Sequence, residues 1–580
     1  MKKKTGAQLV RYALEQLGVR YTFGIPGVHN TEIYDELASS EQITPIRVNH
    51  EASAAFMADA TSRTSGIIGA LVIAPAAGTT MASPGIGEAF LEGIPMLVIS
   101  GGVRNDYGFS YQLHQLDQLA LVGSITKGCW RAESHADIVP MIYEAWHVAN
   151  RGEPGPTFVE IPLNLQLFPG DVENPPQLDP LPPPPCPAPG AIGQAASRLA
   201  AAKHPGLFLG WGCRDSTGLA VELAERLGAP VATTLQGLSV FPATHPLHTG
   251  MGIGSAAVPA ASNAFAKCDV LLAVGTRFGE VATGSFGIES SWKLIHCDIN
   301  PKVFNVNYPA TIALAGDASC TLQALLQQLP PAGSAKSEAA ALCDRIAGDK
   351  RAYLNEWLRH DSRGRVNPAR FFIALRQRLD DDAYLLADAG NHTFLVAELF
   401  STTLSKHVLS PTDFNCMGYC VPAAIGVKLA HPNQQVVGII GDGGFLMTGL
   451  EMLTAAEHGL GIVYFVFNDG DLAQVSEIQS RQYNRKTCTV LPPIRIRSIA
   501  DAVGAEYFEM QEDVSIDSAI DHALAASSKG RPVVVDVRID YSKDTRFTKG
   551  IVKTNLARMS WHNKLRTIGR AAWRRVDVPA

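Results

Sequence analysis

Short apolar runs alternate with stretches of helical periodicity along most of the chain. Up to residue 172 the runs are YTFGIP, ITPIRV, IIGALVIAP, PMLVISGG and PTFVEIP. Apolar runs bounded by glycine or proline are typical of buried strands, and the helical stretches between them are typical of crossover connections. Because strands that alternate with helices pair in parallel, this part of the chain is predicted to form a parallel α/β sheet.

The same pattern recurs twice. The second set of runs is GLFLGWG, APVATTL, DVLLAVGTRF and WKLIHCDIN, and the third is AYLLADAG, QQVVGIIGDGG, GIVYFVFNDG and RPVVVDVRID. A chain of 580 residues is also too long for a single core. The predicted fold class is therefore α/β, with three doubly wound parallel-sheet domains.

Composition marks the boundaries between these domains. The proline-dense residues 174–190 read as an extended linker, since such a run forms neither helix nor central strand. A second boundary lies near residues 330–340, followed by a polar helical stretch to about Arg365. The predicted organisation is an N-terminal domain (1–172), a central domain (190–330), a C-terminal domain (365–545) and a basic tail (546–580).

Two acidic residues follow neighbouring strands of the third domain. The strand QQVVGII runs into Gly441-Asp442-Gly443-Gly444, and the strand GIVYFVF ends in Asn-Asp-Gly-Asp, which contains Asp469 and Asp471. Ligands of parallel sheets bind at the carboxyl edge, and glycines let the backbone approach a phosphate closely. Oxygen ligands from two loops suit Mg²⁺, which shares its coordination shell with phosphate oxygens. The pattern predicts metal-bridged diphosphate binding.

Gly-Asp-Gly alone is a common turn, but 27 residues of strand, helix and strand separate Asp442 from Asp469. In this respect the chain resembles thiamine diphosphate (ThDP) enzymes of the acetolactate synthase type, within the 2-oxo acid decarboxylase and carboligase superfamily. The resemblance implies that Asp442 and Asp469 bind Mg²⁺ through their side chains and Asp471 through its backbone carbonyl. It also implies that Gly441, Gly443 and Gly444 contact the cofactor. Asn is commoner than Asp at position 469, so a second carboxylate is expected to change the metal affinity.

The resemblance extends to the N-terminal domain. Residues 43–66 read as a strand followed by a helix, with Glu51 at the junction, and the Gly24-Ile25-Pro26-Gly27 turn lies upstream. A carboxylate in the first turn of a helix can simply stabilise the helix dipole. In the family, the Glu at this position hydrogen-bonds the aminopyrimidine ring, and a desolvated carboxyl can exchange a proton there near neutral pH. Glu51 is therefore the predicted activator, and Gly27 a predicted cofactor contact.

Three further residues are predicted to contact the cofactor. Met417 lies 25 residues before Asp442, where the family places the large apolar residue that props the two cofactor rings into a V. Its alternative role is core filling, for which methionine is well suited. The sequence AGNHTF resembles the loop that caps the diphosphate, which makes Asn391 and His392 candidate contacts.

The substrate region departs from the biosynthetic acetohydroxyacid synthases, which carry a Trp where this chain has Ile478 and an apolar residue where it has Gln474. Leu113-His114-Gln115 replaces their phenylalanine-glutamine-glutamate pattern. With an ordinary pKa near 6.5, a histidine there can act as acid or base, whereas the alternative is a surface loop residue. His114 and Gln115 are predicted to be catalytic, and the predicted substrate pocket is Gln474, Ile478 and Val28.

The predicted reaction is ThDP- and Mg²⁺-dependent decarboxylation of a pyruvate-like 2-oxo acid, with acyl transfer to a second carbonyl that gives an acyloin or a 2-hydroxy-2-acyl acid. One alternative is simple decarboxylation, including that of guanidino-2-oxo acids, whose cationic tail Asp471 and Glu477 would meet. Another is an FAD-containing enzyme, because GTRFGEVATGSF (275–286) resembles the flavin region of some relatives. The third is a catalytically silent, cofactor-binding protein, against which the intact Glu51, Asp442 and Asp469 weigh.

Composition limits the classes of partner that the protein is expected to bind. A net charge of −6 shows no bias toward nucleic acid, and no window approaches the apolar length of a membrane span. The ten scattered cysteines are predicted to be the reduced thiols of a cytoplasmic protein. Residues 547–576 are basic and lack any acidic residue, which leaves open a solvated amphipathic helix, a lid over the active site or a membrane-surface segment. The family also implies a homo-oligomer, with a dimer as the minimum and a tetramer expected.

Overall fold

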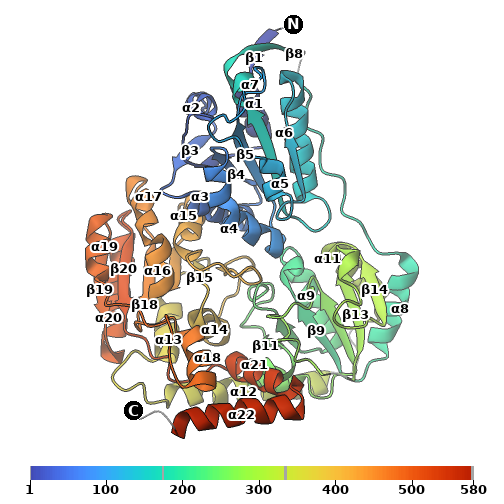
Figure 1. Cartoon of the computed structure of the whole chain (residues 1–580). Helices are drawn as coiled ribbons and strands as arrows, with labels where there is room; N and C mark the ends of the chain where they lie inside the picture. The colour runs from blue at the N-terminus through green and yellow to red at the C-terminus, as the bar shows by residue number, and fades with distance from the viewer. Residues whose placement is uncertain (1, 173–174, 290, 332–335, 577–580) are drawn as a thin grey trace.

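The computed structural model describes residues 2–172, 175–289, 291–331 and 336–576. It contains three six-stranded parallel sheets, each with helices packed on its faces (Figure 1). The predicted fold class is therefore confirmed. Residue 174 of the predicted linker, residues 332–335 of the second predicted boundary and the last four residues of the tail lie outside the described residues.

The N-terminal sheet has the strand order β3-β2-β4-β5-β7-β6, and a separate antiparallel ribbon pairs β1 (Lys2–Thr5) with β8 (Pro169–Val172). Strands β4, β5 and β7 are buried along their whole length, which explains why they read as continuous apolar runs. The remaining elements are β2 (Tyr21–Gly24), β3 (Thr44–Arg47), β4 (Gly69–Ile73), β5 (Met96–Gly102), β6 (Gly128–Arg131), β7 (Pro156–Pro162), α1 (Gly6–Gln16), α2 (Thr31–Ala38), α3 (Glu51–Ser65), α4 (Ala77–Glu92), α5 (Gln118–Val122), α6 (His135–Asn150) and α7 (Leu163–Leu167).

The central sheet has the order β11-β10-β9-β12-β13-β14. Residues 175–188 contain no helix or strand, in agreement with the proline-rich composition, and α8 begins at Pro189. The elements are α8 (Pro189–Ala200), β9 (Pro205–Leu209), α9 (Thr217–Leu227), β10 (Val231–Thr233), β11 (His248–Met251), the short helix η2 (Gly254–Ala256), α10 (Pro259–Ala264), β12 (Val270–Val274), β13 (Lys293–Asp298), β14 (Ile312–Ala315) and α11 (Ala318–Gln328).

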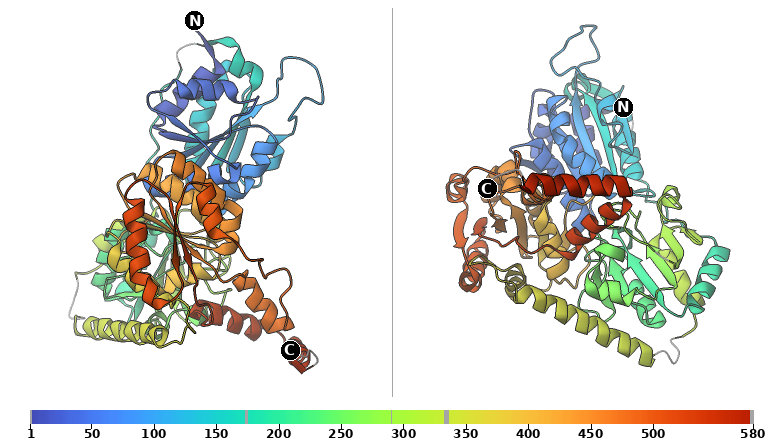
Figure 2. Two further views of the ribbon diagram at one scale, coloured as in Figure 1. Left: turned by 90° about the vertical axis from the view of Figure 1, so that its left-hand side faces the viewer. Right: turned by 60° about the horizontal axis from the view of Figure 1, so that its bottom comes forward.

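The C-terminal sheet has the order β16-β15-β17-β18-β20-β19, and two hydrophobic clusters bury its two faces. Helix α12 (Lys336–Leu358) leads into it, and α21 (Arg546–Arg558) and α22 (Trp561–Val576) follow it along one edge of the molecule (Figure 2). The elements between them are α13 (Pro368–Arg378), β15 (Tyr384–Ala387), α14 (Asn391–Leu399), β16 (Val408–Leu409), α15 (Cys420–Ala430), β17 (Val436–Gly441), α16 (Asp442–Thr448), α17 (Met452–Glu457), β18 (Val463–Phe467), α18 (Ala473–Tyr483), α19 (Ile496–Ala502), β19 (Glu506–Met510), α20 (Ile516–Ser527) and β20 (Val533–Val537).

The expectation that all cysteines are reduced thiols is wrong for two of them. Cys186 of the extended segment forms a disulfide with Cys320 of α11, 134 residues later, and the Cα atoms lie 5.7 Å apart. The segment folds back onto the N-terminus of α11, where the Asp317 N–H donates to the Pro185 carbonyl at 2.8 Å. The other eight cysteines are free. Sequence spacing could not reveal a pair that only the folded path of the linker brings together.

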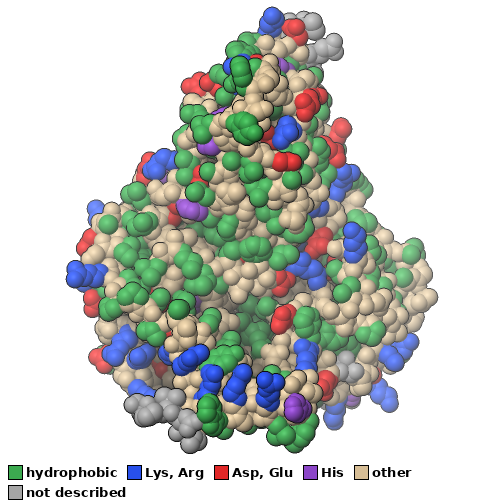
Figure 3. Space-filling view, viewed as in Figure 1, with side chains coloured by type: hydrophobic (Ala, Val, Ile, Leu, Met, Phe, Trp, Pro, Cys, Tyr) green, Lys and Arg blue, Asp and Glu red, His purple; other side chains and the backbone are tan. Residues whose placement is uncertain are grey.

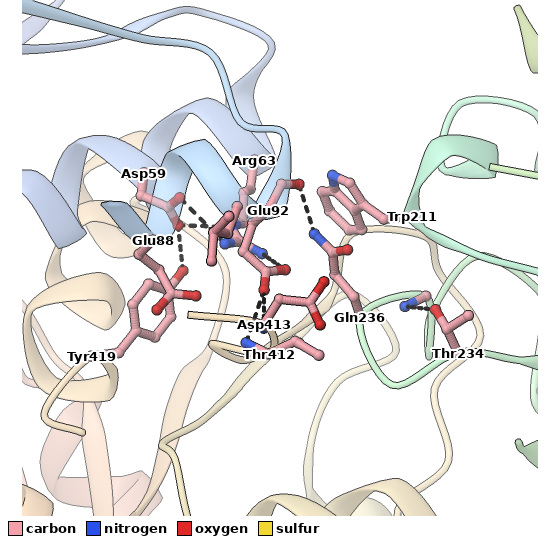
Figure 4. Close-up of polar contacts among 12 residues, drawn as sticks. Asp59, Arg63, Glu88, Glu92, Trp211, Thr234, Gln236, Thr412, Asp413 and Tyr419 are labelled. Carbon is pink, nitrogen blue, oxygen red and sulfur yellow. Dashed lines mark hydrogen bonds and ion pairs between the residues drawn. The ribbon is translucent and has the colours of Figure 1, made fainter. Parts of the chain in front are cut away.

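A buried polar cluster joins the N-terminal and C-terminal domains (Figure 4). Helices α3 and α15 pack against each other, and Arg63 Nε lies 2.7 Å from Asp59 Oδ1 with both side chains almost fully buried. Asp59 also accepts a hydrogen bond of 2.7 Å from the Tyr419 hydroxyl. Glu92 at the end of α4 lies 3.8 Å from the Arg63 guanidinium. The domain junction therefore depends on charge pairing as well as on apolar packing.

Replacing Asp59 by alanine is expected to destabilise the protein by about 3–5 kcal/mol, because it leaves the Arg63 charge buried without its closest partner. Denaturant unfolding measures the change. Glu222→Ala is the matched control, since Glu222 pairs with Arg226 at the same i,i+4 spacing but is about half exposed. The control is expected to change stability by less than about 1 kcal/mol. Equal effects of the two substitutions would contradict the role given to the cluster.

A buried histidine in the central domain predicts acid sensitivity. Burial, followed by the nearby Lys350 charge, lowers the pKa of His248 to about 3. The folded state thus binds fewer protons than the unfolded chain between pH 6.5 and 3, so stability is lost as pH falls through this window. We expect a loss of about 2 kcal/mol between pH 6.5 and pH 5, measured by urea unfolding. His248→Gln should reduce this slope; an unchanged slope in the variant would contradict the assignment.

Candidate active site

A cavity of about 300 Å³ lies at the carboxyl edge of the C-terminal sheet. It is bounded by the residues that follow β15, β17 and β18 and by α18, which is where ligands of parallel sheets bind. Predicted site residues that line it are Asn391, His392, Met417, Gly441, Asp442, Gly443, Gly444, Asp469, Asp471, Gln474 and Ile478. The structure thus brings together residues spread over almost ninety positions of the sequence.

The glycines after β17 are required by close packing. A Cβ atom on Gly444 would lie 2.0 Å from the Asp388 carboxylate, and one on Gly443 would lie 2.5 Å from Leu472. A side chain at either position would displace the cavity wall. The Gly443-Gly444 pair therefore leaves room for the Asp388 and Leu472 side chains, and its contact with a phosphate stays a prediction.

Asp442 joins the two acidic loops. Its carboxylate accepts hydrogen bonds of 2.8 Å from the Gly443 and Gly470 N–H groups, so it holds the turn after β18 against the start of α16. Burial raises the pKa of Asp442, and burial, together with the charges of Asp442 and Asp471, raises that of Asp469 to about 7. Two partly buried carboxylates that disfavour each other's ionisation suit a divalent cation, whose charge would offset the repulsion.

Asp471 takes a different position. Its carboxylate accepts from the Ser476 hydroxyl and forms an ion pair with Lys486, so the side chain is already engaged. That engagement fits the expected use of its backbone carbonyl. Among the described residues no group of three or more His, Cys, Asp or Glu side chains is arranged to hold a metal ion. A cation at this site would thus take two side chains, a carbonyl and oxygens of the diphosphate.

The segment 411–418, which carries Met417, is fixed from both sides. Asp388 accepts from the Gly418 and Cys420 N–H groups at 2.8 and 3.1 Å, and burial raises the pKa of Asp388 to about 7. On the other side, Glu88 of α4 accepts from the Cys416 N–H at 3.1 Å. Glu92 accepts from two further N–H groups of the segment, at 3.0 and 2.6 Å (Figure 4). Sequence reasoning missed these three carboxylates, although Asp388 directly follows an apolar strand.

His392 and Asn391 lie at the start of α14. Burial lowers the pKa of His392 to about 4, so the imidazole is neutral, and its Nε2 atom has no hydrogen-bond partner among the described residues. An unpartnered buried nitrogen beside the cavity fits contact with a polar ligand. The Asn391 amide donates to Glu477 at 3.1 Å, and burial raises the pKa of Glu477.

The predicted N-terminal residues lie at the carboxyl edge of their own sheet. Glu51 begins α3 and is 92% buried, and a Cβ atom on Gly78 would lie 3.3 Å from its carboxylate. Gly27 donates its N–H to Asn30 at 2.6 Å, and Val28 beside it is 64% exposed. Gln115 accepts from the Gln112 N–H at 2.9 Å within an exposed loop.

His114 is paired with a histidine that sequence reasoning missed. Its ring centroid lies 5.1 Å from that of His29, the residue after Val28. Burial, followed by the His114 charge, lowers the pKa of His29. The Nδ1 atoms of both rings lack a hydrogen-bond partner among the described residues. The pair thus places two imidazoles with unused nitrogens at this edge of the sheet.

The carboxyl edges of the N-terminal and C-terminal sheets do not form one site within a single chain. The described residues that line the C-terminal cavity all fall between 389 and 541, so neither Glu51 nor His114 belongs to its wall. One chain presents a diphosphate-sized cavity on one domain and a buried carboxyl with two imidazoles on another.

A second cavity of about 260 Å³ lies where the three domains meet. Arg214, Arg277 and Asp298 line it, together with the Gly275–Gly279 part of the predicted flavin region. Burial raises the pKa of Asp298 to about 6, and Arg277 is paired with Asp413 at 2.6 Å and with Glu153 at 3.3 Å. Two guanidinium groups and a carboxyl suit a nucleotide, although both guanidinium groups already have carboxylate partners, Arg214 with Asp215 at 3.5 Å and Arg277 as above.

Comparison with known proteins accounts for all three sheets. Family models for the thiamine pyrophosphate enzymes match residues 4–121 (N-terminal TPP binding domain), 192–325 (central domain) and 388–537 (C-terminal TPP binding domain). An acetolactate synthase large subunit of Haemophilus influenzae is 29% identical over 555 residues, covering 94% of this chain and 96% of that protein. A probable acetolactate synthase large subunit of Methanocaldococcus jannaschii is 31% identical and covers 92% of each chain.

A relative with a different name is as similar. The probable 2-ketoarginine decarboxylase AruI of Pseudomonas aeruginosa is 32% identical over 482 residues, which cover 82% of this chain and 84% of that protein. The expected resemblance is therefore confirmed at the level of the family, whereas the relatives' names divide between two reactions. With all three domains matched in order, the chain belongs to the thiamine pyrophosphate enzyme family and is a ThDP-dependent enzyme of the acetolactate synthase type.

Proposed function

We propose that the protein decarboxylates a pyruvate-like 2-oxo acid with ThDP and Mg²⁺ and transfers the acyl group to a second carbonyl. The observation that carries this proposal is the cavity where Asp442, Asp469, Met417 and His392 meet. Bound ThDP supplies the carbanion chemistry and the electron sink that decarboxylation of a 2-oxo acid needs. The chain's own residues would bind the cofactor, orient the substrate and transfer protons.

In this proposal the C-terminal domain binds the diphosphate end of the cofactor. Asp442 and Asp469 hold Mg²⁺ with the Asp471 carbonyl, and the glycines of the Gly441–Gly444 turn admit the phosphate oxygens. His392 offers its unpartnered Nε2 to the ligand, and Asn391 lies beside it. Met417, on a segment fixed by three carboxylates, lines the cavity and would support the cofactor rings.

The N-terminal domain handles protons. Glu51 is buried in the first turn of α3 and is assigned to proton exchange with the aminopyrimidine nitrogen. In this proposal His114 and Gln115 are the side chains that would hold or deliver a proton beside the bound substrate, and Gln474, Ile478 and Val28 would shape the acceptor pocket. A proton held by His114 would favour an aldehyde product over transfer to a second carbonyl.

Incubation with ThDP, Mg²⁺ and pyruvate, with CO₂ measured and products identified by NMR, tests the reaction. Acetolactate or acetoin with CO₂ supports carboligation. Acetaldehyde alone supports the simple decarboxylase. Absence of turnover with bound ThDP contradicts a pyruvate-like donor and supports the alternative of a catalytically silent protein.

The second candidate substrate class is 2-oxo acids with a guanidino tail. The similarity to AruI favours it. Glu477 lies in α18 between the cavity-lining residues Gln474 and Ile478, and burial, followed by the Asp544 charge, raises its pKa. A cationic tail would pair with Glu477 in place of its present partners. Comparing kcat/KM for 5-guanidino-2-oxopentanoate and pyruvate, in the native protein and in Glu477→Gln, separates the two classes. Only a guanidino substrate should lose affinity in the variant.

FAD in the central cavity is a further cofactor candidate, supported by Arg214, Asp298 and the Gly275–Gly279 stretch. The visible absorbance of oxidised flavin in purified protein, released on denaturation, would establish it. A colourless protein that gains no absorbance with added FAD would remove the flavin-dependent alternative.

We also propose a homo-oligomer, a dimer at least and a tetramer by family expectation, in which Glu51 of one subunit serves the cavity of another. The absence of N-terminal residues from the described cavity wall supports this. Glu51→Gln and Asp442→Ala chains, each inactive alone, should regain about a quarter of native activity when dissociated and mixed, because half of randomly formed two-fold dimers contain one intact site. No recovery in verified mixed oligomers would contradict sharing.

A cytoplasmic location is also proposed, and the eight free cysteines support it. No helix among the described residues has the length and apolarity to cross a bilayer. Partition of the native enzyme between cell fractions after a high-salt wash tests the location, because enzyme docked on the inner membrane face by charge is then released into the cytoplasmic fraction.

A further inference from the structure

Positive charge is concentrated in α21 and α22, called here the basic tail (residues 546–576). The tail contains nine Lys and Arg residues and no Asp or Glu. Since the whole chain has a net charge of −6 and the tail contributes +9, the rest of the chain carries −15. The molecule is thus strongly polarised, with one basic edge (Figure 3).

Helix α22 rests on the body of the protein through polar and basic side chains. The guanidinium groups of Arg570 and Arg574 lie over the ring of Tyr483, 5.5 and 5.4 Å from its centre, at the end of α18. The Asn484 amide donates to the Arg574 carbonyl at 3.2 Å. The half-buried positions of α22 are Lys564, Thr567, Ala571 and Arg574. This face is unusual, because an amphipathic helix on a protein surface normally packs its apolar side inward.

The apolar side of α22 faces outward instead. Trp561 is 73% exposed, Trp573 is 65% exposed, and Leu565 and Ile568 between them are each 52% exposed. Trp561, Leu565 and Ile568 recur at helical spacing and form one row. The row of three spans about 10 Å along the helix axis, since each residue rises about 1.5 Å. A helix that acts as a lid, or an ordinary amphipathic surface helix, would bury these side chains. Helix α22 leaves them exposed in the described chain.

A groove between the two tail helices continues this surface. Its floor includes Val552, Leu556 and Ile568, and Lys549, Lys553 and Lys564 stand along it. Lysines beside an exposed apolar floor favour a ligand that offers acyl chains and negative headgroups together.

We propose that the basic tail docks the enzyme on an anionic phospholipid bilayer. The Trp561–Ile568 row enters the boundary between headgroups and acyl chains, with tryptophan at the depth where its ring is most stable. The lysines and arginines of the tail pair with phosphate groups, each contributing to attraction within a Debye length. The anionic surface repels the rest of the chain, which carries a charge of −15. The enzyme therefore binds with its basic tail against the bilayer and its three domains in water.

Cosedimentation of the full-length enzyme with vesicles tests the proposal, using phosphatidylcholine alone and phosphatidylcholine with 30% phosphatidylglycerol (about the anionic fraction needed for a surface potential). The native protein is expected to partition onto the anionic vesicles at least about tenfold more strongly and to be released by salt. The triple variant Trp561→Ser, Leu565→Ser, Ile568→Ser should lose this binding. Lys549→Gln with Lys553→Gln and Lys564→Gln should weaken it and flatten its salt dependence.

The double variant Val306→Ser and Val514→Ser is the matched control, since both valines are more than 60% exposed and lie outside the tail. It should bind like the native protein, and thermal melting shows that each variant is folded. Equal binding to both vesicle types, or undiminished binding of the triple variant, would overturn the proposal. So would failure to bind vesicles combined with a changed oligomeric mass in the triple variant, because a second copy of the chain would then cover the row.

Discussion

Replacing Glu51 by glutamine is expected to slow CO₂ release from the preferred 2-oxo acid by about 10²- to 10⁴-fold, the range that positioned proton transfer contributes. Glutamine keeps the size and the hydrogen-bonding oxygen of the side chain, but it cannot gain or lose a proton near neutral pH. ThDP binding, measured by calorimetry, should stay within a few-fold of native, since the residues proposed to bind the diphosphate and the metal lie on the other domain. The loss should therefore appear in kcat rather than in cofactor affinity.

A carboxylate of the same domain provides the comparison. Glu32 lies in the first turn of α2 and is only half-buried, so Glu32→Gln changes the charge at a helix start without touching a fully buried carboxyl. It is expected to retain full activity. If Glu51→Gln were equally active, Glu51 would be no more than a helix-dipole carboxylate, and proton exchange would have to come from another group.

Asp442→Ala is expected to weaken the joint binding of ThDP and Mg²⁺ by about 100-fold or more, since loss of even outer-shell groups costs 10- to 100-fold in metal sites. The substitution removes a proposed metal ligand and also the acceptor of the Gly443 and Gly470 N–H groups, so both loops lose their common anchor. Titration of the protein with ThDP at several Mg²⁺ concentrations measures the effect. Raising Mg²⁺ should recover part of the binding.

Asp471→Asn separates the backbone role from the side-chain role. The carbonyl of residue 471 is retained in the variant, while the ion pair with Lys486 is lost. ThDP binding should then fall by far less than in Asp442→Ala. A loss as large as that of Asp442→Ala would show that the Asp471 carboxylate itself takes part in metal binding.

Sequence reasoning succeeded where a residue's position follows from the strand pattern. Asp442 and Asp469 lie at the ends of adjacent parallel strands, β17 and β18, so their proximity follows from topology alone. The same reasoning failed where contacts cross domains. Glu88 and Glu92 bind a segment more than three hundred residues away, and the Cys186–Cys320 disulfide depends on the path of an irregular linker.

His29 is a residue that sequence reasoning missed for a different reason. It directly follows Val28, which the pattern did select, but its contact with His114 depends on the conformation of the loop that carries His114. Loop conformation is set by local backbone angles such as the positive φ of His114, for which periodicity carries no signal.

The segment that carries Met417 has a consequence for how this enzyme can be divided. Its backbone is tied to Glu88 and Glu92 of the N-terminal domain and to Asp388 of the C-terminal domain, while Asp413 pairs with Arg277 of the central domain. A fragment comprising the C-terminal domain alone would keep the proposed diphosphate ligands but lose most of these ties. The segment that carries Met417 would then be held only by Asp388, so a domain exchanged between relatives would have to bring α4 together with the segment it holds.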